Sequence, residues 1–378
     1  VRGTADPGSA DQGRRRPGPA ARMTPGQGIP AATIDLSRAT SAEVVDYLAA
    51  RALDVGPGSS VEKLTGGVSG TVIKIRGAHR DLILKQALAD LAVPRAWHAD
   101  RRRSLTEARA LELLHGLTPS ATAELVDVDP EALTLTMTCA PSSWSSWKEQ
   151  LLAGPTGARA EVIGRRLGQV LAAWHQHTTD PQIRSGFSDH PTFRSLRSDP
   201  FYRALGTDHP ALADTLHDLA DHLDDARICL VHGDFSPKNV LTPAMPDSVD
   251  TTGGDGGQVP LWVVDHEVMV QGDPVFDLAF MLCHLSCKSV DPQRRSLVHT
   301  AAAFVNSYRD HDGLPVDDGS LAAHTAALML ARVDGVSQVN YLDATARDLI
   351  RGTAAQILGT PGAGLAELWS ALQEGTAR

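Results

Sequence analysis

Cysteine and long apolar runs are both scarce in this sequence. The four cysteines are too few and too scattered for the disulfide framework of a small secreted domain. No window approaches the roughly 18 consecutive apolar residues that a membrane-spanning helix needs. The arginines at 14–16 are followed by Pro17 rather than by an apolar stretch, so no secretory signal is predicted. We therefore expect a cytoplasmic protein without a membrane partner.

Basic side chains are in the minority. The chain has 35 Lys and Arg against 45 Asp and Glu, a formal net charge of −10. An acidic surface repels phosphate backbones, which argues against a nucleic-acid partner. Only 6 of the basic residues are lysines, so each lysine within a motif is informative. The 378 residues, 42% of them hydrophobic, suffice for two lobes with a sizeable core.

The spacing of apolar residues divides the chain into a tail and two lobes. Residues 1–30, rich in Gly, Pro and Arg, show no periodicity and predict a disordered tail. Residues 31–140 predict an N-lobe with an antiparallel sheet and one inserted helix, and residues 141–378 predict a larger, mainly helical C-lobe. The expected fold class is therefore α+β. We expect a monomer or a homodimer.

Individual elements follow from the same patterns. Short β-branched or apolar runs between Gly-bearing breaks predict N-lobe strands at 61–65, 71–76, 82–86, 125–128 and 133–138. Thr40 and Ser41 are predicted to cap a first helix, which runs through Leu53 and ends before Gly56. Helical spacing predicts helices at 105–114, 160–177, 211–225, 275–288, 292–312, 318–334, 343–358 and 364–374. Two short strands are predicted at 228–231 and 261–264, and the Pro- and Gly-rich residues 242–260 predict a long mobile loop.

The strongest chemical signal is His232-Gly233-Asp234, which follows an apolar strand and precedes Asn239 by a few residues. Phosphoryl transfer from ATP to a hydroxyl needs a carboxylate near the attacking oxygen. It also needs a neutral oxygen ligand for Mg²⁺ from the same loop. Asp234 fits the first role and Asn239 fits the second, whereas either residue alone would indicate only a solvated turn.

A second segment, Asp265-His266-Glu267, follows a short apolar run. An ionised Asp265 at the end of a buried strand is costly unless it pairs or binds a cation, and Mg²⁺ on the ATP phosphates would supply that partner. The pattern leaves two interpretations of Glu267 open. It is either a Mg²⁺ ligand or a neighbour of the ligands, or it is a solvated residue.

In this order and spacing, these motifs resemble the aminoglycoside phosphotransferase and methylthioribose kinase superfamily, which has a two-lobed protein-kinase-like fold and acts on small molecules. Residues 232–239 are similar to its catalytic loop, residues 265–267 stand in the place of Asp-Phe-Gly, and residues 272–279 resemble the segment that follows. The resemblance implies ATP and Mg²⁺ as cofactors, a catalytic Asp234 and a small-molecule acceptor with a hydroxyl group. It also implies that Asp273 and Asp277 brace the loops.

The N-lobe carries a lysine that the resemblance assigns to the nucleotide. Residues 82–86 alternate, so Lys85 faces away from Leu84, and a lysine on the third strand is expected to reach the α- and β-phosphates. Its expected partner is Glu107 on the following helix, with Glu112 as the competitor.

Two backbone segments are also expected to contact the nucleotide. Gly66 and Gly67 allow a close backbone approach, and N–H groups from there to Ser69 can cover phosphates. Residues 137–140, which include Met137 and Cys139, are expected to form the hinge between the lobes, whose backbone meets adenine.

The acceptor is expected to be a hydroxyl of a sugar or amino sugar, as in antibiotic-resistance kinases. The alternative is a metabolic kinase for methylthioribose or another sugar or amino-alcohol. Methylthioribose kinases use adjacent arginines where this chain has only Arg332, and they lack the asparagine found here at Asn239. Arg332 and Tyr341 could face the acceptor, although an arginine on a helix surface is usually solvated.

Two other classes fit less well. Only 12 positions separate Asp265 from Asp277 and no Ala-Pro-Glu follows, which leaves no room for the activation segment of a protein kinase. A pseudokinase that binds nucleotide without turnover is disfavoured because Lys85, Asp234 and Asn239 are all present. Measured phosphate transfer decides between an enzyme and a pseudokinase.

Activity is expected to require a hard divalent cation, because Asp265 and Asn239 offer oxygen donors and no His or Cys joins them at ligand spacing. EDTA should abolish ADP release, Mg²⁺ or Mn²⁺ should restore it, and Zn²⁺ should not be required. Asp265→Ala should lower kcat more than Asn239→Ala, because the carboxylate carries the charge. Glu267→Gln should raise the Mg²⁺ requirement if Glu267 is a ligand. Full activity of Asp265→Ala would contradict the assignment of this segment.

Overall fold

Five antiparallel strands form the sheet predicted for the N-lobe. The computed structural model describes residues 34–64, 69–89, 99–154, 157–244 and 259–376, so the predicted tail at 1–30 lies outside the described residues. The strands in spatial order are β1 (Ser60–Leu64), β2 (Gly70–Arg76), β3 (Asp81–Ala87), β5 (Thr134–Thr138) and β4 (Leu125–Asp129). Their bounds confirm the predicted strands to within a residue.

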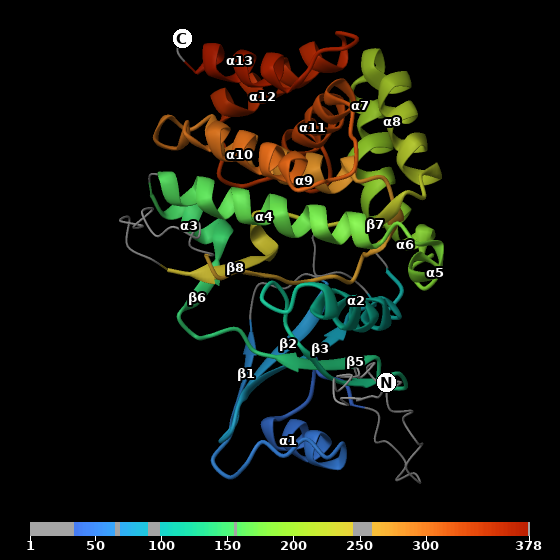
Figure 1. Ribbon diagram of the computed structural model, residues 1–378, viewed down its shortest axis with the longest axis vertical. Helices are drawn as coiled ribbons and strands as arrows, with labels where there is room; N and C mark the ends of the chain where they lie inside the picture. The colour runs from blue at the N-terminus through green and yellow to red at the C-terminus, as the bar shows by residue number, and fades with distance from the viewer. Residues whose placement is uncertain (1–33, 65–68, 90–98, 155–156, 245–258, 377–378) are drawn as a thin grey trace, which may run out of the picture. The chain divides into compact units, whose positions relative to one another are not determined.

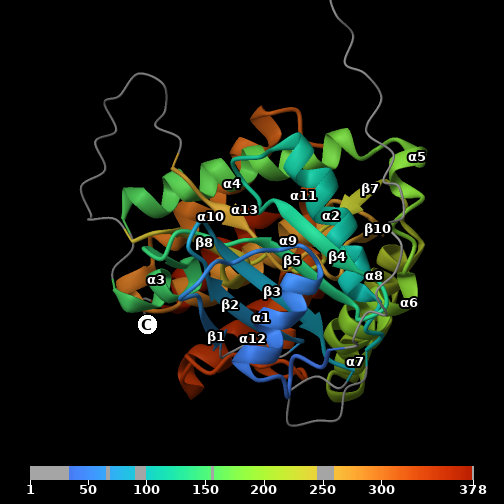
Figure 2. The same ribbon diagram turned by 90° about the horizontal axis from the view of Figure 1, so that it is seen from below.

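A helix packs on each face of this sheet, α1 (Ser41–Ala50) on one and α2 (Arg103–Leu117) on the other (Figure 2). Val44 and Leu48 of α1 share a buried cluster with Leu84 of β3. On the opposite face, Leu111 of α2 packs with Leu135 of β5. Side chains alternate along a strand, so the residue after Leu84 points toward α2.

The first helix begins at the predicted cap. The N–H of Glu43 donates to Thr40 Oγ1 at 3.3 Å, and the N–H of Thr40 donates to Glu43 Oε2 at 2.8 Å. This reciprocal pair satisfies backbone donors that the first turn of a helix leaves without partners. Of the two predicted caps, Thr40 is the one used, and the helix ends at Ala50, earlier than the predicted Leu53.

The rest of the described chain is mainly helical, which confirms the α+β class. The helices are α3 (Trp147–Ala153), α4 (Ala158–His177), α5 (Pro181–Arg184), α6 (His190–Phe193), α7 (Ala204–Asp208), α8 (Ala213–Asp225), α9 (Val275–Ser289), α10 (Leu297–Asp310), α11 (Asp318–Val333), α12 (Ala344–Leu358) and α13 (Leu365–Gly375). A π-helix, η1 (Arg194–Arg203), and short 3₁₀ helices η2 (Pro210–Leu212), η3 (Pro237–Asn239) and η4 (Pro292–Arg294) complete them.

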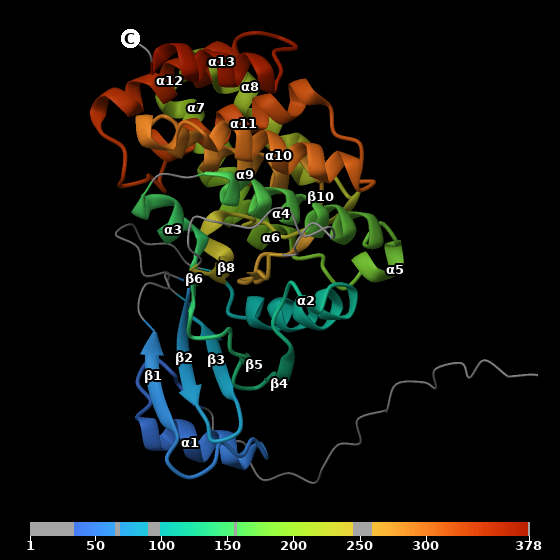
Figure 3. The same ribbon diagram turned by 60° about the vertical axis from the view of Figure 1, so that its left-hand side comes forward.

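Figures 1 and 3 show α9 to α13 together at one end, and the five-strand sheet with α1 at the other. Residues 33–378 form one compact unit, within which the division into lobes near residue 140 stays a prediction. Across the described ranges, every helix is too short or too polar to cross a membrane.

Short strands support the functional loops, and some of them differ from the predictions. β7 (Cys229–Val231) pairs with β10 (Val270–Gly272), whereas β8 (Val240–Pro243) lies between β6 (Trp144–Ser146) and β9 (Trp262–Val263). The predicted loop at 242–260 is therefore wrong at its start, because residues 242 and 243 belong to β8. Residues 245–258 of that loop lie outside the described residues.

Helices α4 and α10 approach closely at two glycines one helical turn apart. A Cβ on Gly164 would lie 2.9 Å from the Thr300 carbonyl oxygen, and one on Gly168 would lie 2.4 Å from the Phe304 carbonyl oxygen. Both distances are well inside van der Waals contact, and backbone atoms cannot swing aside as the end of a side chain can. Glycine at these positions lets the two helix backbones meet.

Gly168→Ala should therefore lower the free energy of unfolding by about 1–3 kcal/mol, because the added methyl group overpacks the α4–α10 contact. The matched control is Gly352→Ala in the interior of α12, where no heavy atom lies within 4 Å of the added Cβ. That change should stabilise the protein by about 0.5–1 kcal/mol through helix propensity. Urea unfolding measures both, and equal effects of the two substitutions would contradict the packing argument.

Candidate active site

Asp234 lies in a loop that Asp277 holds in place. Gly233 has a φ of +76°, a left-handed conformation that glycine adopts readily. Asp277 is fully buried in the first turn of α9 and accepts the N–H groups of His232 at 2.6 Å and of Gly233 at 3.0 Å. His175 Nε2 contacts the same carboxylate at 3.2 Å. These bonds fix the path of the chain after β7, as expected for a carboxylate that braces the loop.

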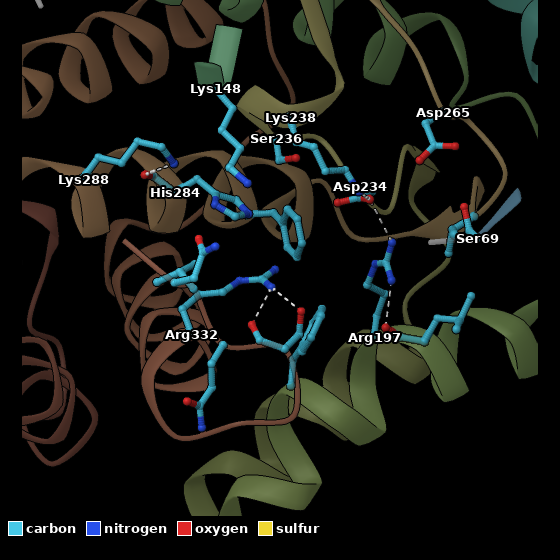
Figure 4. Close-up of a pocket in the computed structure, with 18 of the residues that line it drawn as sticks. Ser69, Lys148, Arg197, Asp234, Ser236, Lys238, Asp265, His284, Lys288 and Arg332 are labelled. Atoms are coloured by element: carbon cyan, nitrogen blue, oxygen red, sulfur yellow. Dashed lines mark hydrogen bonds and ion pairs between the residues drawn. The ribbon is translucent and has the colours of Figure 1, made fainter. Parts of the chain in front are cut away.

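The Asp234 carboxylate faces two cations and lines a cavity (Figure 4). Arg197 Nη2 lies 3.4 Å from Asp234 Oδ2, and Lys238 Nζ donates to the same oxygen at 3.2 Å. Burial alone would raise the pKa of Asp234, but Lys238 and Arg197 outweigh burial and hold the pKa below its usual value. The carboxylate is therefore ionised at neutral pH and can accept a hydrogen bond from a hydroxyl in the cavity.

Asn239 is buried on η3 and links the two predicted metal-binding segments. Its Nδ2 donates to the backbone oxygen of Asp234 at 3.0 Å. Its own backbone oxygen accepts the N–H of Val264, the residue before Asp265, at 2.9 Å. The fold thus ties the catalytic loop directly to the end of β9.

Lys85 lies among three carboxylates. Its Nζ donates to Glu107 Oε1 at 2.9 Å and also contacts Asp265. Oxygen atoms of Glu107, Asp265 and Glu267 lie within 4.8 Å of one another. The predicted partner Glu107 is the one that contacts Lys85, whereas the competitor Glu112 is exposed.

The charges of this cluster shift one another's pKa. Burial and the neighbouring carboxylates raise the pKa of Glu107 to about 7, against the opposing effect of Lys85. Burial also acts to raise the pKa of Asp265, but Lys85 and Lys238 hold that pKa well below its usual value. Glu107, Asp265 and Glu267 form a carboxylate cluster whose possible metal ligands are all oxygen atoms. Oxygen is the ligand that Mg²⁺ prefers.

Glu267 is buried and paired. Its Oε2 lies 3.1 Å from Nε of Arg103, which is fully buried on α2. The interpretation of Glu267 as a solvated residue is therefore wrong. Arg103 also donates to the backbone oxygens of Ser69 and Leu88, so it ties α2 to the wall of the cavity.

The residues predicted to contact the nucleotide reach the cavity only in part. Ser69 lines it, whereas Gly66 and Gly67 lie outside the described residues. Met137 packs in the core beneath α2, and the N–H of Cys139 already donates to a carbonyl of β3 at 3.2 Å. Neither residue lines the cavity. An adenine contact from this segment would have to use its other backbone groups.

The cavity has a volume of about 300 Å³ and a highly charged lining. Its acidic lining residues are Asp234, Asp265 and Glu267, and its basic lining residues are Lys148, Arg197, Lys238, Lys288 and Arg332. Figure 4 labels all of these except Glu267. The side chain of Tyr341 lines the cavity as well.

Several of these cations were not identified from the sequence. Arg332 was left open between a residue that faces the acceptor and a solvated one, and the structure excludes the solvated alternative, because Arg332 is 6% exposed and lines the cavity. Arg197 stands in no recognisable motif. The scarcity of lysine was the usable signal, because Lys148, Lys238 and Lys288 line the cavity and Lys85 contacts a carboxylate that lines it.

Comparison with solved structures gives matches at low sequence identity. The macrolide 2′-phosphotransferase of Brachybacterium faecium is 18% identical, with 87% of this chain and 97% of that chain covered and a TM-score of 0.48. The choline kinase of Streptococcus pneumoniae is 13% identical, with 88% and 97% covered and a TM-score of 0.46. No curated protein sequence matches this chain.

The model of the APH phosphotransferase enzyme family matches residues 60–314. The matched range contains the five-strand sheet, the loop of Asp234 and the whole carboxylate cluster, and it spans well over half of the chain. It confirms the resemblance inferred from the motifs. The chain belongs to the APH phosphotransferase enzyme family and is a small-molecule kinase.

Proposed function

We propose that this kinase transfers the γ-phosphoryl group of ATP to a hydroxyl of a sugar or an amino sugar. The observation that carries the proposal is an ionised Asp234 carboxylate that shares one cavity with Asp265 and Glu267. A phosphotransferase needs this pairing, since the hydroxyl must be oriented next to the groups that hold the phosphates.

Asp234 is the residue that acts on the acceptor. Its carboxylate accepts a hydrogen bond from the hydroxyl and directs an oxygen lone pair at the γ-phosphorus. As the new O–P bond forms and the bond to the bridging oxygen breaks, ADP leaves and the hydroxyl proton passes to Asp234. The low pKa of Asp234 makes it a weak base, so it orients the hydroxyl early and takes the proton late.

Other residues hold the nucleotide. Lys85, oriented by Glu107, carries a positive charge that suits the α- and β-phosphates. Asn239 and Asp265, with Glu267 beside them, would hold Mg²⁺, which when bound neutralises negative charge on the phosphates. Asp277 contributes by keeping the loop of Asp234 in position.

The acceptor class has two candidates, an amino-sugar antibiotic and a metabolic sugar or amino-alcohol. ADP release in the presence of ATP or GTP and a panel of aminoglycosides, nucleoside antibiotics, methylthioribose, choline and homoserine tests the proposal. Nucleotide binding without acceptor-dependent ADP release for any hydroxyl compound would instead support the pseudokinase alternative.

Asp234→Asn should lower kcat by about 10²–10⁴-fold and leave nucleotide affinity nearly unchanged, because the carboxylate acts on the acceptor hydroxyl. The control is Asp225→Asn, which removes an exposed carboxylate at the end of α8. Steady-state kinetics and nucleotide titration are measured on the same preparations. Near-wild-type kcat in Asp234→Asn would remove this residue from the mechanism.

Lys85→Ala should weaken nucleotide use, and Glu107→Ala should impair the same step. Because the two side chains contact each other, the double substitution should cost clearly less than the sum of the single ones. Glu112→Ala on the exposed face of α2 is the control and should change kcat/KM for ATP little. Additive losses for Lys85 and Glu107 would show that they do not act as a pair.

A further inference from the structure

Three cations gather on one side of the cavity. Lys148 of α3, Lys288 of α9 and Arg332 of α11 come from different helices and line the same space. In Figure 4 they lie on one side of Asp234, and Asp265 lies on the other. Charged side chains from three separate helices thus converge on a place that the proposed mechanism does not use.

The carboxylates that line the cavity are already matched by other cations. The pairs are Asp234 with Arg197 and Lys238, Asp265 with Lys85, and Glu267 with Arg103. Within the described ranges, no ion pair joins a carboxylate to Lys148, Lys288 or Arg332. The three cations therefore leave an excess of positive charge on their side of the cavity.

Lys288 is nearly fully buried, at 1% exposed, and the hydrogen-bond partners that it has among the described residues are neutral. Its Nζ donates to the His284 carbonyl at 3.1 Å and to the Tyr341 hydroxyl at 3.4 Å, and it lies 4.9 Å from the centre of the Tyr341 ring. Burial, with Lys148 and Arg332 nearby, lowers the pKa of Lys288 to about 8. A buried ammonium without a counter-charge is costly, and an anion in the cavity would reverse that cost.

Arg332 is held in place but is not neutralised. Its guanidinium lies 4.7 Å from the ring centre of Phe201 and 5.0 Å from that of Phe280, and Nη1 donates to the Ser337 backbone oxygen at 3.1 Å. Nε is buried without a hydrogen-bond partner among the described residues. The buried Cys283 thiol lies beside the guanidinium. Burial acts to raise the pKa of this thiol, but Cys287, Arg332 and Lys288 outweigh burial and lower the pKa. The two rings fix the plane of a fork that can still donate to a carboxylate or phosphate.

This charge disfavours a polycationic acceptor. An amino sugar with several ammonium groups would meet Lys148, Lys288 and Arg332 at close range and in a partly buried space, where like charges repel strongly. An acceptor with an anionic group would supply the counter-charge that the side chains lack.

We propose that the acceptor carries a carboxylate or a phosphate group, bound by Lys288 and Arg332 with Lys148 beside them, while its hydroxyl meets Asp234. The substrate class is then hydroxy acids, sugar acids or sugar phosphates. This assignment rests on the proposed phosphotransferase function and puts an anionic hydroxyl compound in the place of the amino-sugar acceptor.

Binding is tested first, without turnover. The wild-type protein, saturated with ADP and Mg²⁺, is titrated calorimetrically with malonate and with inorganic phosphate, which separates carboxylate from phosphate recognition. Lys288→Met and Arg332→Gln should each weaken anion binding by at least about tenfold, because a charged hydrogen bond is lost. Lys288→Arg should restore most of it, and the exposed control Lys63→Met should bind like the wild type.

Turnover is tested with matched acceptors. D-Glucuronate, D-glucose and D-glucosamine share one ring and differ in charge, and glycerate, glycerol and 3-amino-1,2-propanediol repeat the comparison on a shorter chain. D-Glucose 6-phosphate tests a phosphate in the place of the carboxylate on the same sugar. The highest kcat/KM should belong to an anionic member, and Lys288→Met should raise its KM while leaving the affinity for ATP unchanged.

The outcomes separate this proposal from the function on which it rests. Faster turnover of the cationic members, with dependence on Asp234, would keep the phosphotransferase and overturn the anion site. Equal anion binding in the wild type and Lys288→Met would also overturn it, as would a loss of ATP affinity in Lys288→Met, because the cations would then serve the nucleotide. Charge-dependent anion binding without Asp234-dependent turnover would support the anion site and contradict the proposed function.

Discussion

The ammonium group of Lys85 is the contact on which the rest of this structure depends. It lies between Glu107 on α2 and Asp265 after β9, so one positive charge joins the sheet, the helix that covers it and the loops of the helical part. Removing such charges from water is costly unless they are matched, and here two cations, Lys85 and Arg103, face three carboxylates. The remaining negative charge makes the cluster a candidate site for a divalent cation rather than a closed ion pair.

Charges of opposite sign are separated across the cavity. Carboxylates predominate on the side of Asp265, and on the side of Lys288 predominate cations that form no ion pair with a described carboxylate. Asp234 lies between the two sides, and its own two cations, Arg197 and Lys238, keep its carboxylate ionised. A molecule that has both a hydroxyl and a charged group would be bound in one orientation by such a field, because turning it around would bring like charges together.

The main elements and part of the site followed from the sequence because their signals are local. Alternation along β3 placed Lys85 opposite Leu84, and helical spacing located α4 and α9 to α13. Strands such as β6 and β10, of three residues each, are too short to show a period. Arg103 stands in a run of arginines typical of a surface, and its long side chain reaches Glu267 only through the tertiary fold. Arg197 was not predicted for the same reason, because its side chain reaches Asp234 only through the tertiary fold.

Helix α9 connects the loop of Asp234 to Lys288. Asp277 in its first turn positions the loop of Asp234, and Lys288 stands at its other end, about 16 Å away along the axis at about 1.5 Å per residue. The helix is buried along almost its entire length, so it cannot stretch or bend to suit a ligand. It therefore holds Asp277 and Lys288 at a fixed separation. If the proposed anion site holds the acceptor, this fixed separation sets how far the anionic group of the acceptor lies from the hydroxyl that is phosphorylated.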